Sequence, residues 1–362
     1  MQRKYCRRGL LNHKTINIMK RIFILLIAAC QTVTVLAQDN DSKTPYSTKS
    51  LANDAISKVI VSTSAGGILV SGQSGQVARI EVYIKGTNNH HLSNEEIKKR
   101  LDEDYDMNIS VNRHELSATV KTKHENMDWS NGLSISFKIY VPEQVSTELK
   151  TSGGGIQLDN LKGDENFNTS GGGLQIKSLS GKIHGRTSGG GIEESNSSDE
   201  IDLQTSGGGI SAKDCSGNIN LGTSGGGLQL EDLKGTIKAH TSGGGISGKR
   251  IAGELVVGTS GGGIDLKEMN CSLEAVTSAG SLNAEIEHVG KYLKLSTSAG
   301  NINLHLPEKQ GLDLNLRAER ISDNIASNFH GEWDKKHVAG SVNGGGISVD
   351  VNANNNLNVT FN

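Results

Sequence analysis

Apolar and polar residues alternate in a pattern that returns every 18 residues between Thr151 and Thr277. Counted from the threonine that opens each stretch, positions 6, 8, 11, 15 and 17 are apolar, and the threonine falls on the same side as positions 15 and 17. Alternation with a period of two is typical of a strand with one buried face. The pattern therefore predicts strands with polar outer faces and threonine methyl groups that pack inward. In the stretch that opens at Thr223, the five apolar positions hold Leu228, Leu230, Leu233, Ile237 and Ala239.

Each stretch opens with Thr-Ser-Gly-Gly-Gly followed by Ile or Leu. A fixed period without insertions is typical of a solenoid, in which each repeat is one coil stacked on the previous one. Position 13 is also glycine in most copies, so we expect the triplet and position 13 to form the corners, where positive φ or close backbone approach excludes side chains. The seven copies begin at Thr151, Thr169, Thr187, Thr205, Thr223, Thr241 and Thr259. A degenerate eighth copy, Thr-Ser-Ala-Gly-Ser-Leu, begins at Thr277.

The predicted fold is all-β, a single-stranded β-solenoid of the β-helix or β-roll type with 18-residue coils and an irregular N-terminal cap. Helix is excluded because three adjacent glycines per repeat would cost about 3 kcal/mol in a helix interior. Successive coils should lie about 4.8 Å apart. The period alone suits equally a triangular left-handed helix with six residues on each side.

The same pattern divides the chain into five segments. The cap keeps the strand alternation without the strict repeat, and Val59–Ile68 is a degenerate first copy. Ser93 and Glu96 form a capping box, which predicts one short helix near Asn94–Asp102 that covers the open end of the stack. The segments are a signal peptide at 1–37, a polar linker at 38–50, the N-terminal β cap at 51–150, the regular solenoid at 151–296 and degenerate C-terminal coils at 297–362.

The N-terminus has the features of an export signal. Met19, an alternative true start, precedes two basic residues and the apolar run Ile22–Ala29, and small residues favour cleavage after Ala37. A rival interpretation takes Ile27–Cys30 as a lipoprotein cleavage box that leaves Cys30 lipidated, although the apolar stretch continues beyond it. No other segment approaches the ~20 apolar residues that span a bilayer. We therefore expect the protein in the periplasm, at the outer membrane or outside the cell.

Removal of the signal peptide makes the net charge of the chain more negative. The full chain has 37 basic and 39 acidic residues, and residues 1–37 hold seven of the basic ones and no acid, so the exported chain has 30 against 39, a net charge of −9. This balance argues against nucleic acid or anionic lipid as a partner.

The two remaining cysteines, Cys215 and Cys271, lie three coils or about 14 Å apart, and a disulfide needs Cα atoms within about 7 Å. We expect both to be free.

A catalytic group is needed once, so a motif that occurs seven times indicates scaffold. The strongest enzymatic rival is a polysaccharide lyase or hydrolase, which needs paired carboxylates roughly 5–9 Å apart. Asp214 and Asp232 occupy position 10 of adjacent coils, and Glu231 lies beside them. Because position 9 alternates lysines with acids, we interpret these residues as a solvated column of mixed charge.

The coil that opens at Thr187 departs from the pattern. It carries Glu194, Ser197 and Asp199 where its neighbours have two apolar residues and a glycine. A binding notch is one interpretation, and the favoured one is a local bulge that turns these residues to water.

The histidines of the repeat lie on separate coils, and the glycines lack the lysine of a phosphate loop and the aspartates of a calcium roll. We expect no cofactor and no metal.

The layout resembles the bacterial putative-adhesin domain family, a group of uncharacterised secreted or surface β-solenoid domains. Three features carry the resemblance: Val59–Ile68 at the start, Ile139–Pro142 leading into the first repeat, and Leu304–Pro307 after the last clear copy. The resemblance covers roughly residues 55–350 and implies a right-handed solenoid. It implies no biochemical activity, because a fold does not by itself define a function.

These observations predict a non-catalytic secreted or envelope-associated module, structural or adhesive, that presents an elongated polar surface to a glycan or a surface protein. One alternative is the polysaccharide-acting β-helix enzyme. Aromatic residues make up only 4% of the chain, and carbohydrate clefts of enzymes usually carry aromatic platforms, which disfavours it. Another alternative is a periplasmic envelope-stress or assembly component that needs a rigid spacer.

Overall fold

The computed structural model describes residues 44–75, 77–87, 92–124, 129–322 and 326–361. The expected signal peptide, the alternative start at Met19 and the lipidation site at Cys30 lie outside these ranges. The chain divides into two units, Met1–Thr44 and Pro45–Asn362, and the following account concerns the second. It is a β-solenoid, as the repeat predicts. Among the described residues, no helix is both long and apolar enough to cross a bilayer.

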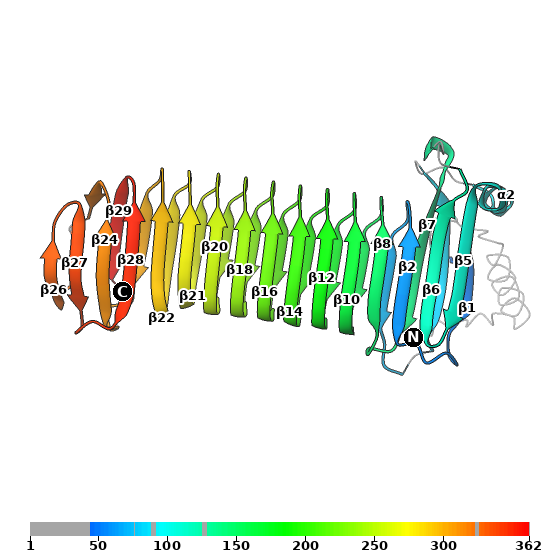
Figure 1. Cartoon of the computed structure of the whole chain (residues 1–362), viewed down its shortest axis with the longest axis horizontal. Coiled ribbons are helices and arrows are strands. Elements are labelled where there is room, and N and C mark those ends of the chain that lie inside the picture. The colour runs from blue at the N-terminus through cyan, green and yellow to red at the C-terminus, as the bar shows by residue number, and fades with distance from the viewer. Residues whose placement is uncertain (1–43, 76, 88–91, 125–128, 323–325, 362) are drawn as a thin grey trace, which may run out of the picture. The chain divides into compact units, whose positions relative to one another are not determined.

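Each regular coil contains two strands, a short one at positions 6–9 and a long one that runs from position 12 to the threonine of the next coil. In the first coil these are β9 (Ile156–Asp159) and β10 (Lys162–Thr169). Strands of successive coils pair in parallel, each residue with the residue 18 places later, so a short-strand sheet and a long-strand sheet run along the stack (Figure 1). Two strands per coil exclude the triangular arrangement with three sides of six residues.

The remaining coils follow the same plan. The short strands are β11 (Leu174–Lys177), β13 (Ile192–Ser195), β15 (Ile210–Lys213), β17 (Leu228–Glu231) and β19 (Ile246–Lys249). The long strands are β12 (Ser180–Thr187), β14 (Ser198–Thr205), β16 (Ser216–Thr223), β18 (Lys234–Thr241) and β20 (Ala252–Thr259). In the last two coils the strands merge into β21 (Ile264–Thr277) and β22 (Leu282–Thr297). Their pairing contains register shifts, because the final coil of the segment expected to be regular is two residues longer than 18.

The opening threonines are buried, as predicted, and they also join the coils through their hydroxyl groups. Thr205 Oγ1 donates to the Gly190 carbonyl of the preceding coil at 2.7 Å and accepts from the Gly208 amide at 3.3 Å. The same pair of bonds recurs at every copy from Thr151 onward. The threonine column is therefore a hydrogen-bonded ladder inside the core.

The middle glycine of the triplet, at position 4, is required by close approach of two backbones. A Cβ on Gly208 would lie far inside van der Waals contact of the Gly190 carbonyl oxygen, whereas a Cβ on Gly207 would lie 3.4 Å from its nearest neighbour. The degenerate copies agree, since position 3 becomes alanine in them and position 4 stays glycine. Those copies carry Ala65-Gly66, Ala279-Gly280 and Ala299-Gly300.

The second corner lies at position 10 and not at position 13. Every residue at position 10 of the repeat has a positive φ of 53–57°. Glycine at position 13 lies inside the long strand, where Gly181, Gly217, Gly235 and Gly253 also have positive φ. The expected corner was thus misplaced by three residues, because polar residues such as Asn and Asp tolerate the left-handed region at a turn. The position-10 residues are Asn160, Ser178, Asn196, Asp214, Asp232, Arg250 and Glu268.

The N-terminal part folds back on the first coil. Strands β2 (Lys58–Thr63) and β3 (Ile68–Gly72) pair with β8 (Ser146–Thr151) and β9, and the chain between them builds outward. Strands β6 (Glu115–Thr122) and β7 (Leu133–Val141) form the next layer, followed by antiparallel β5 (Tyr105–Asn112) and β4 (Arg79–Gly86). A short 3₁₀ helix η2 (Trp129–Asn131) precedes β7.

Helix α2 (Asn94–Asp104) contacts β5, the outermost strand of the long-strand sheet. The Ser93 side chain accepts from the Glu96 amide at 3.2 Å, which is one half of the predicted capping box. The expected linker requires correction, because its last residues form β1 (Ser47–Ser50), antiparallel to β4. This polar strand covers the hydrogen-bonding edge that β4 would otherwise expose.

The C-terminal coils do not stack in sequence order. Strands β28 (Ile347–Ala353) and β29 (Asn356–Phe361) pair with β22 and β23 (Ile302–Leu306), although they come last in the chain. The intervening β24 (Leu312–Arg317) and β25 (Arg320–Ile321) lie beyond them. Antiparallel β27 (His337–Val342) and β26 (Phe329–Trp333) complete this end. The last two strands of the chain thus insert against earlier coils, as β2 and β3 do against the first regular coil at the other end.

We expect Gly208→Ala to lower the free energy of unfolding by roughly 2–3 kcal/mol, because the new methyl group forces two turns apart. Urea unfolding followed by circular dichroism measures the change. Gly207→Ala is the matched control and should lie within about 0.5 kcal/mol of the wild type, as befits a site away from strained contacts. Equal losses in the two variants would contradict the role given to position 4.

Candidate functional site

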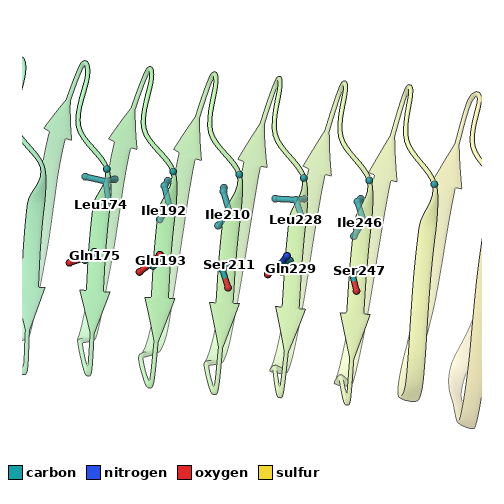
Figure 2. Close-up of a pocket in the computed structure, with 16 residues that line it drawn as sticks. Leu174, Gln175, Ile192, Glu193, Ile210, Ser211, Leu228, Gln229, Ile246 and Ser247 are labelled. Carbon is teal, nitrogen blue, oxygen red and sulfur yellow. The ribbon is translucent and has the colours of Figure 1, made fainter.

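A shallow groove of about 660 Å³ lies on the outer face of the short-strand sheet. It crosses β11, β13, β15, β17 and β19, and Figure 2 shows the side chains that line it. One wall is formed by the glycines at position 5 and the other by the polar side chains at position 7. The position-7 residues in the groove are Gln175, Glu193, Ser211, Gln229 and Ser247.

The glycines of the groove have backbone N–H groups without a partner. Each position-5 carbonyl accepts from the preceding coil, as in the 3.0 Å bond from the Leu174 amide to Gly191. Within the described ranges, no acceptor is found for the N–H groups of Gly173, Gly191, Gly209, Gly227 and Gly245, all of which are exposed. The groove therefore carries a row of free donors, one from each coil.

The N-terminal coil shows which kind of acceptor such an N–H donor can bind. Gly67 occupies the equivalent of position 5, and its N–H donates to the Ser136 hydroxyl at 3.0 Å. Ser136 belongs to β7, one layer further out. A hydroxyl oxygen thus fits this donor without distortion of the turn.

The groove continues into a second hollow of about 490 Å³ on the same sheet. The two hollows share Gln175, Glu193 and Ser211. The second one extends to position 9, where Asp159, Lys177 and Lys213 contribute both signs of charge. The combined surface presents polar side chains of mixed charge beside apolar atoms and has no aromatic residue among its lining residues.

The candidate carboxylates lie at the corner beside this surface. Arg250 donates to both oxygens of Asp232, at 2.6 and 2.7 Å, and to Glu231 at 2.6 Å. Hydrogen bonds from Arg250 hold the pKa of Asp232 and of Glu231 below their usual values. Lys213 also pairs with Glu231, and Asp214 stays outside these bonds. The sequence reasoning missed Arg250, although it follows Asp214 and Asp232 at position 10.

Asp214 and Asp232 are thus corner residues with φ of 54° whose side chains face solvent or an arginine. A general acid must hold a proton near neutral pH. An exposed carboxylate whose pKa is lowered by an arginine does not meet that condition. The arrangement agrees with the expected column of mixed charge.

The expectation of a bulge at Glu194 is wrong, because the strand is regular there. The pairing of β13 with β11 and β15 continues without a register shift, and Glu194 is 3% exposed, at the inward-facing position 8. Neither carboxylate oxygen has a hydrogen-bond partner among the described residues. A bulge would break ladder bonds on both sides of the strand, so the register is kept and the carboxyl is buried beside the small Ala212.

Buried polar groups surround Glu194. The Ser197 hydroxyl donates to the Ser195 carbonyl and accepts from the Leu179 amide. Cys215 is buried on the next coil, where burial and then the charge of Glu194 raise the pKa of its thiol to about 12. Both Cys215 and Cys271 are free thiols. Glu194 is among the residues that line the second hollow, but it is only 3% exposed, so this cluster is largely enclosed by the core.

The comparison with protein families can now be set beside this geometry. The model of the Toastrack DUF4097 family matches residues 69–360. The chain belongs to this family. The resemblance inferred from the repeat motifs is confirmed by this match, and no curated protein matches the chain.

Two solved structures resemble this Toastrack chain at low identity. A putative cell adhesion protein from Clostridium sporogenes ATCC 15579 is 11% identical, with 87% of this chain and 98% of the other covered and a TM-score of 0.20. A putative adhesin from Bacteroides fragilis NCTC 9343 is 10% identical, with 87% and 96% covered and a TM-score of 0.28.

The Toastrack core contains a second buried carboxyl at Glu165, 1% exposed, in the long-strand column of position 15. The Thr147 hydroxyl donates to one of its oxygens at 2.5 Å, and the other oxygen has no partner among the described residues. Burial raises the pKa of Glu165 to about 7 and that of Glu194 to about 8. Both groups are therefore held as neutral acids in the folded chain at mildly acidic pH.

These two groups should make the solenoid less stable as pH rises. Between about pH 4.5 and 8 the unfolded chain has lost these protons and the folded chain still holds them, so stability falls with pH and then levels off. At about 1.4 kcal/mol per pKa unit, Glu194 contributes a fall on the order of 5 kcal/mol. Urea unfolding at pH 5, 6.5 and 8 measures this fall in the free energy of unfolding.

Glu194→Gln removes one titrating group at nearly constant shape and should flatten this pH dependence. Glu193→Gln, the outward-facing neighbour, is the matched control and should leave it unchanged. A Glu194→Gln variant whose pH dependence equals that of the wild type would show that this carboxyl is not buried as described.

Proposed function

We propose that the protein is a non-catalytic, exported surface module that binds an extended glycan along the groove of the short-strand sheet. The observation that carries this proposal is the row of unpartnered N–H donors at position 5 beside the amide, hydroxyl and carboxylate groups at position 7. Such a row recognises a chain with regularly spaced oxygen acceptors. The export signal, on which the surface location depends, is part of the proposal.

The chemistry of the groove favours sugar hydroxyls. A hydroxyl both donates and accepts, so it can take the glycine N–H and return a hydrogen bond to a neighbouring Gln, Ser or Glu side chain. The bond between Gly67 and Ser136 is an example within the chain itself. Polyanions are disfavoured because the position-5 and position-7 rows of the groove hold no lysine or arginine, and because Glu193 lines it.

The spacing also favours a glycan over a polypeptide. Neighbouring strands lie about 4.8 Å apart, and an extended polypeptide advances only about 3.3 Å per residue. A polypeptide that ran across the coils would therefore fall out of step with the donors. One sugar ring of an extended glycan spans about one coil, so each ring can meet the same pair of groups.

The lack of catalysis is proposed from the state of the acidic groups. Asp232 and Glu231 are exposed, bonded to Arg250 and held as carboxylates. Glu194 and Glu165 have raised pKa values, but both are almost completely buried, including Glu194 where it lines the second hollow. No pair of carboxyl groups on the groove thus combines access to a sugar with the protonation of a general acid.

A glycan array and intact bacterial cells are suitable probes, because they present many polymers at once. We expect Ser211→Trp, which fills the groove at its middle coil, to weaken binding at least tenfold. Asn218→Trp places the same side chain on the exposed outer face of the long-strand sheet and is the matched control. It should bind like the wild type.

The double variant Asp214→Ala/Asp232→Ala should also bind like the wild type, and no bound polymer should be shortened. Loss of a hydrolytic or lyase activity in the double variant would establish the enzymatic alternative. Binding that survives Ser211→Trp unchanged would remove the groove from the account.

A further inference from the structure

A separate depression of about 320 Å³ lies on the outer face of the long-strand sheet toward its C-terminal end. It spans β21, β22, β28 and β24, which pair in this order and can be followed in Figure 1. Its side chains do not repeat, because β28 and β24 come from the irregular last coils. It is also distinct from the groove, which lies on the other sheet.

Two rows of side chains cross the depression. The first row, in register across the four strands, is Glu274, Lys294, Asp350 and Asn315. The second row, two residues further along each strand, is Val276, Ser296, Asn352 and Arg317.

The first row carries two acids, Glu274 and Asp350, and one base, Lys294, so its net charge is −1. Asn315 and Ser348 donate to the two oxygens of Asp350 at 2.9 and 2.8 Å, and these bonds hold its pKa low. Lys294 lies in register between Glu274 and Asp350, and its ammonium is 5.4 Å from the centre of the Tyr292 ring. This row has no excess positive charge to offer an anionic ligand.

The second row carries one charge, on Arg317, which is close enough to Asp350 to help lower the pKa of that carboxyl. In the described part of the chain, the Arg317 guanidinium has no hydrogen bond or ion pair. Arg186 on β12 occupies the same row of the sheet and is held by Gln204 at 2.5 Å and His184 at 3.0 Å. An arginine on this face is thus fixed where partners exist, and Arg317 makes no such bond beside the neutral Asn352.

The rest of the second row suits a small, partly apolar ligand. Val276 is 42% exposed, one of few large apolar side chains so exposed among the described residues. Ser296 and Asn352 supply neutral hydrogen-bonding groups between Val276 and Arg317. A volume near 300 Å³ is at the lower end for small-ligand sites.

We propose that this depression binds a sugar residue that carries a single carboxylate, such as a uronic acid. The carboxylate meets the planar guanidinium of Arg317, whose fork of donors matches two carboxylate oxygens. The ring lies over Val276, and its hydroxyls meet Ser296 and Asn352. Phosphate and sulfate esters are disfavoured because Glu274 and Asp350 line the same depression and repel a higher negative charge.

The test compares two tetrasaccharides of the same linkage, one ending in glucuronic acid and one ending in glucose, by calorimetric titration of the full chain. We expect the acidic tetrasaccharide to bind at least tenfold more tightly. Arg317→Gln should remove that preference and leave binding of the neutral tetrasaccharide unchanged. Arg186→Gln, on the same row of the sheet, is the matched control and should keep the preference.

Three results would overturn the proposal: equal binding of the two tetrasaccharides, a preference that survives Arg317→Gln, or tighter binding of a peptide with a free C-terminal carboxylate. The thermal unfolding midpoint of each variant confirms that it folds. The groove variant Ser211→Trp should keep the acidic preference. This result separates failure of the depression from failure of the groove.

Discussion

The close approach of successive turns at position 4 of each coil is the constraint on which the rest of the structure depends. No side chain fits at position 4. The hydroxyl of the threonine that opens the coil donates to a glycine carbonyl of the preceding coil and accepts from a glycine amide of its own coil. Because the threonine is buried and its two bonds join adjacent coils, the coils must stack in strict register. The strict register explains why even a glutamate at position 8 stays inside the core.

The same constraint produces the candidate binding surface. Position 5 is less crowded than position 4, since a Cβ added to its glycines along the groove would lie 2.9–3.3 Å from the nearest atom. Its N–H points outward and has no partner within the described ranges. The last glycine lining the groove is Gly263, and Ser281 occupies position 5 of the next coil. The glycines that shape the turn therefore also limit the groove at its C-terminal end.

Much of the fold could be predicted from the 18-residue period, including the buried columns, the inward threonines and the parallel stack. The corner at position 10 was missed because Asn, Asp, Ser, Arg and Glu share no obvious pattern there except tolerance of positive φ. The order of the last coils could not be predicted either. Pairing of β28 with β22 depends on contacts between segments some fifty residues apart, which no local pattern reveals.

The site was less predictable than the fold. Asp214, Glu231 and Asp232 were placed correctly on the surface, but their partner Arg250 was not considered, and Glu194 was expected outside the core. The groove itself depends on which backbone donors remain free. That property follows from the way one coil lies on the next, and a sequence of glycines does not show it.

Replacement of one ladder threonine by its isostere tests the central claim most directly. Thr205→Val keeps the shape and removes the hydroxyl that joins Gly190 and Gly208. Leaving these two groups unpaired should lower the free energy of unfolding by about 2 kcal/mol, measured by urea denaturation. A valine variant as stable as the wild type would contradict the view that the threonine ladder fixes the stack.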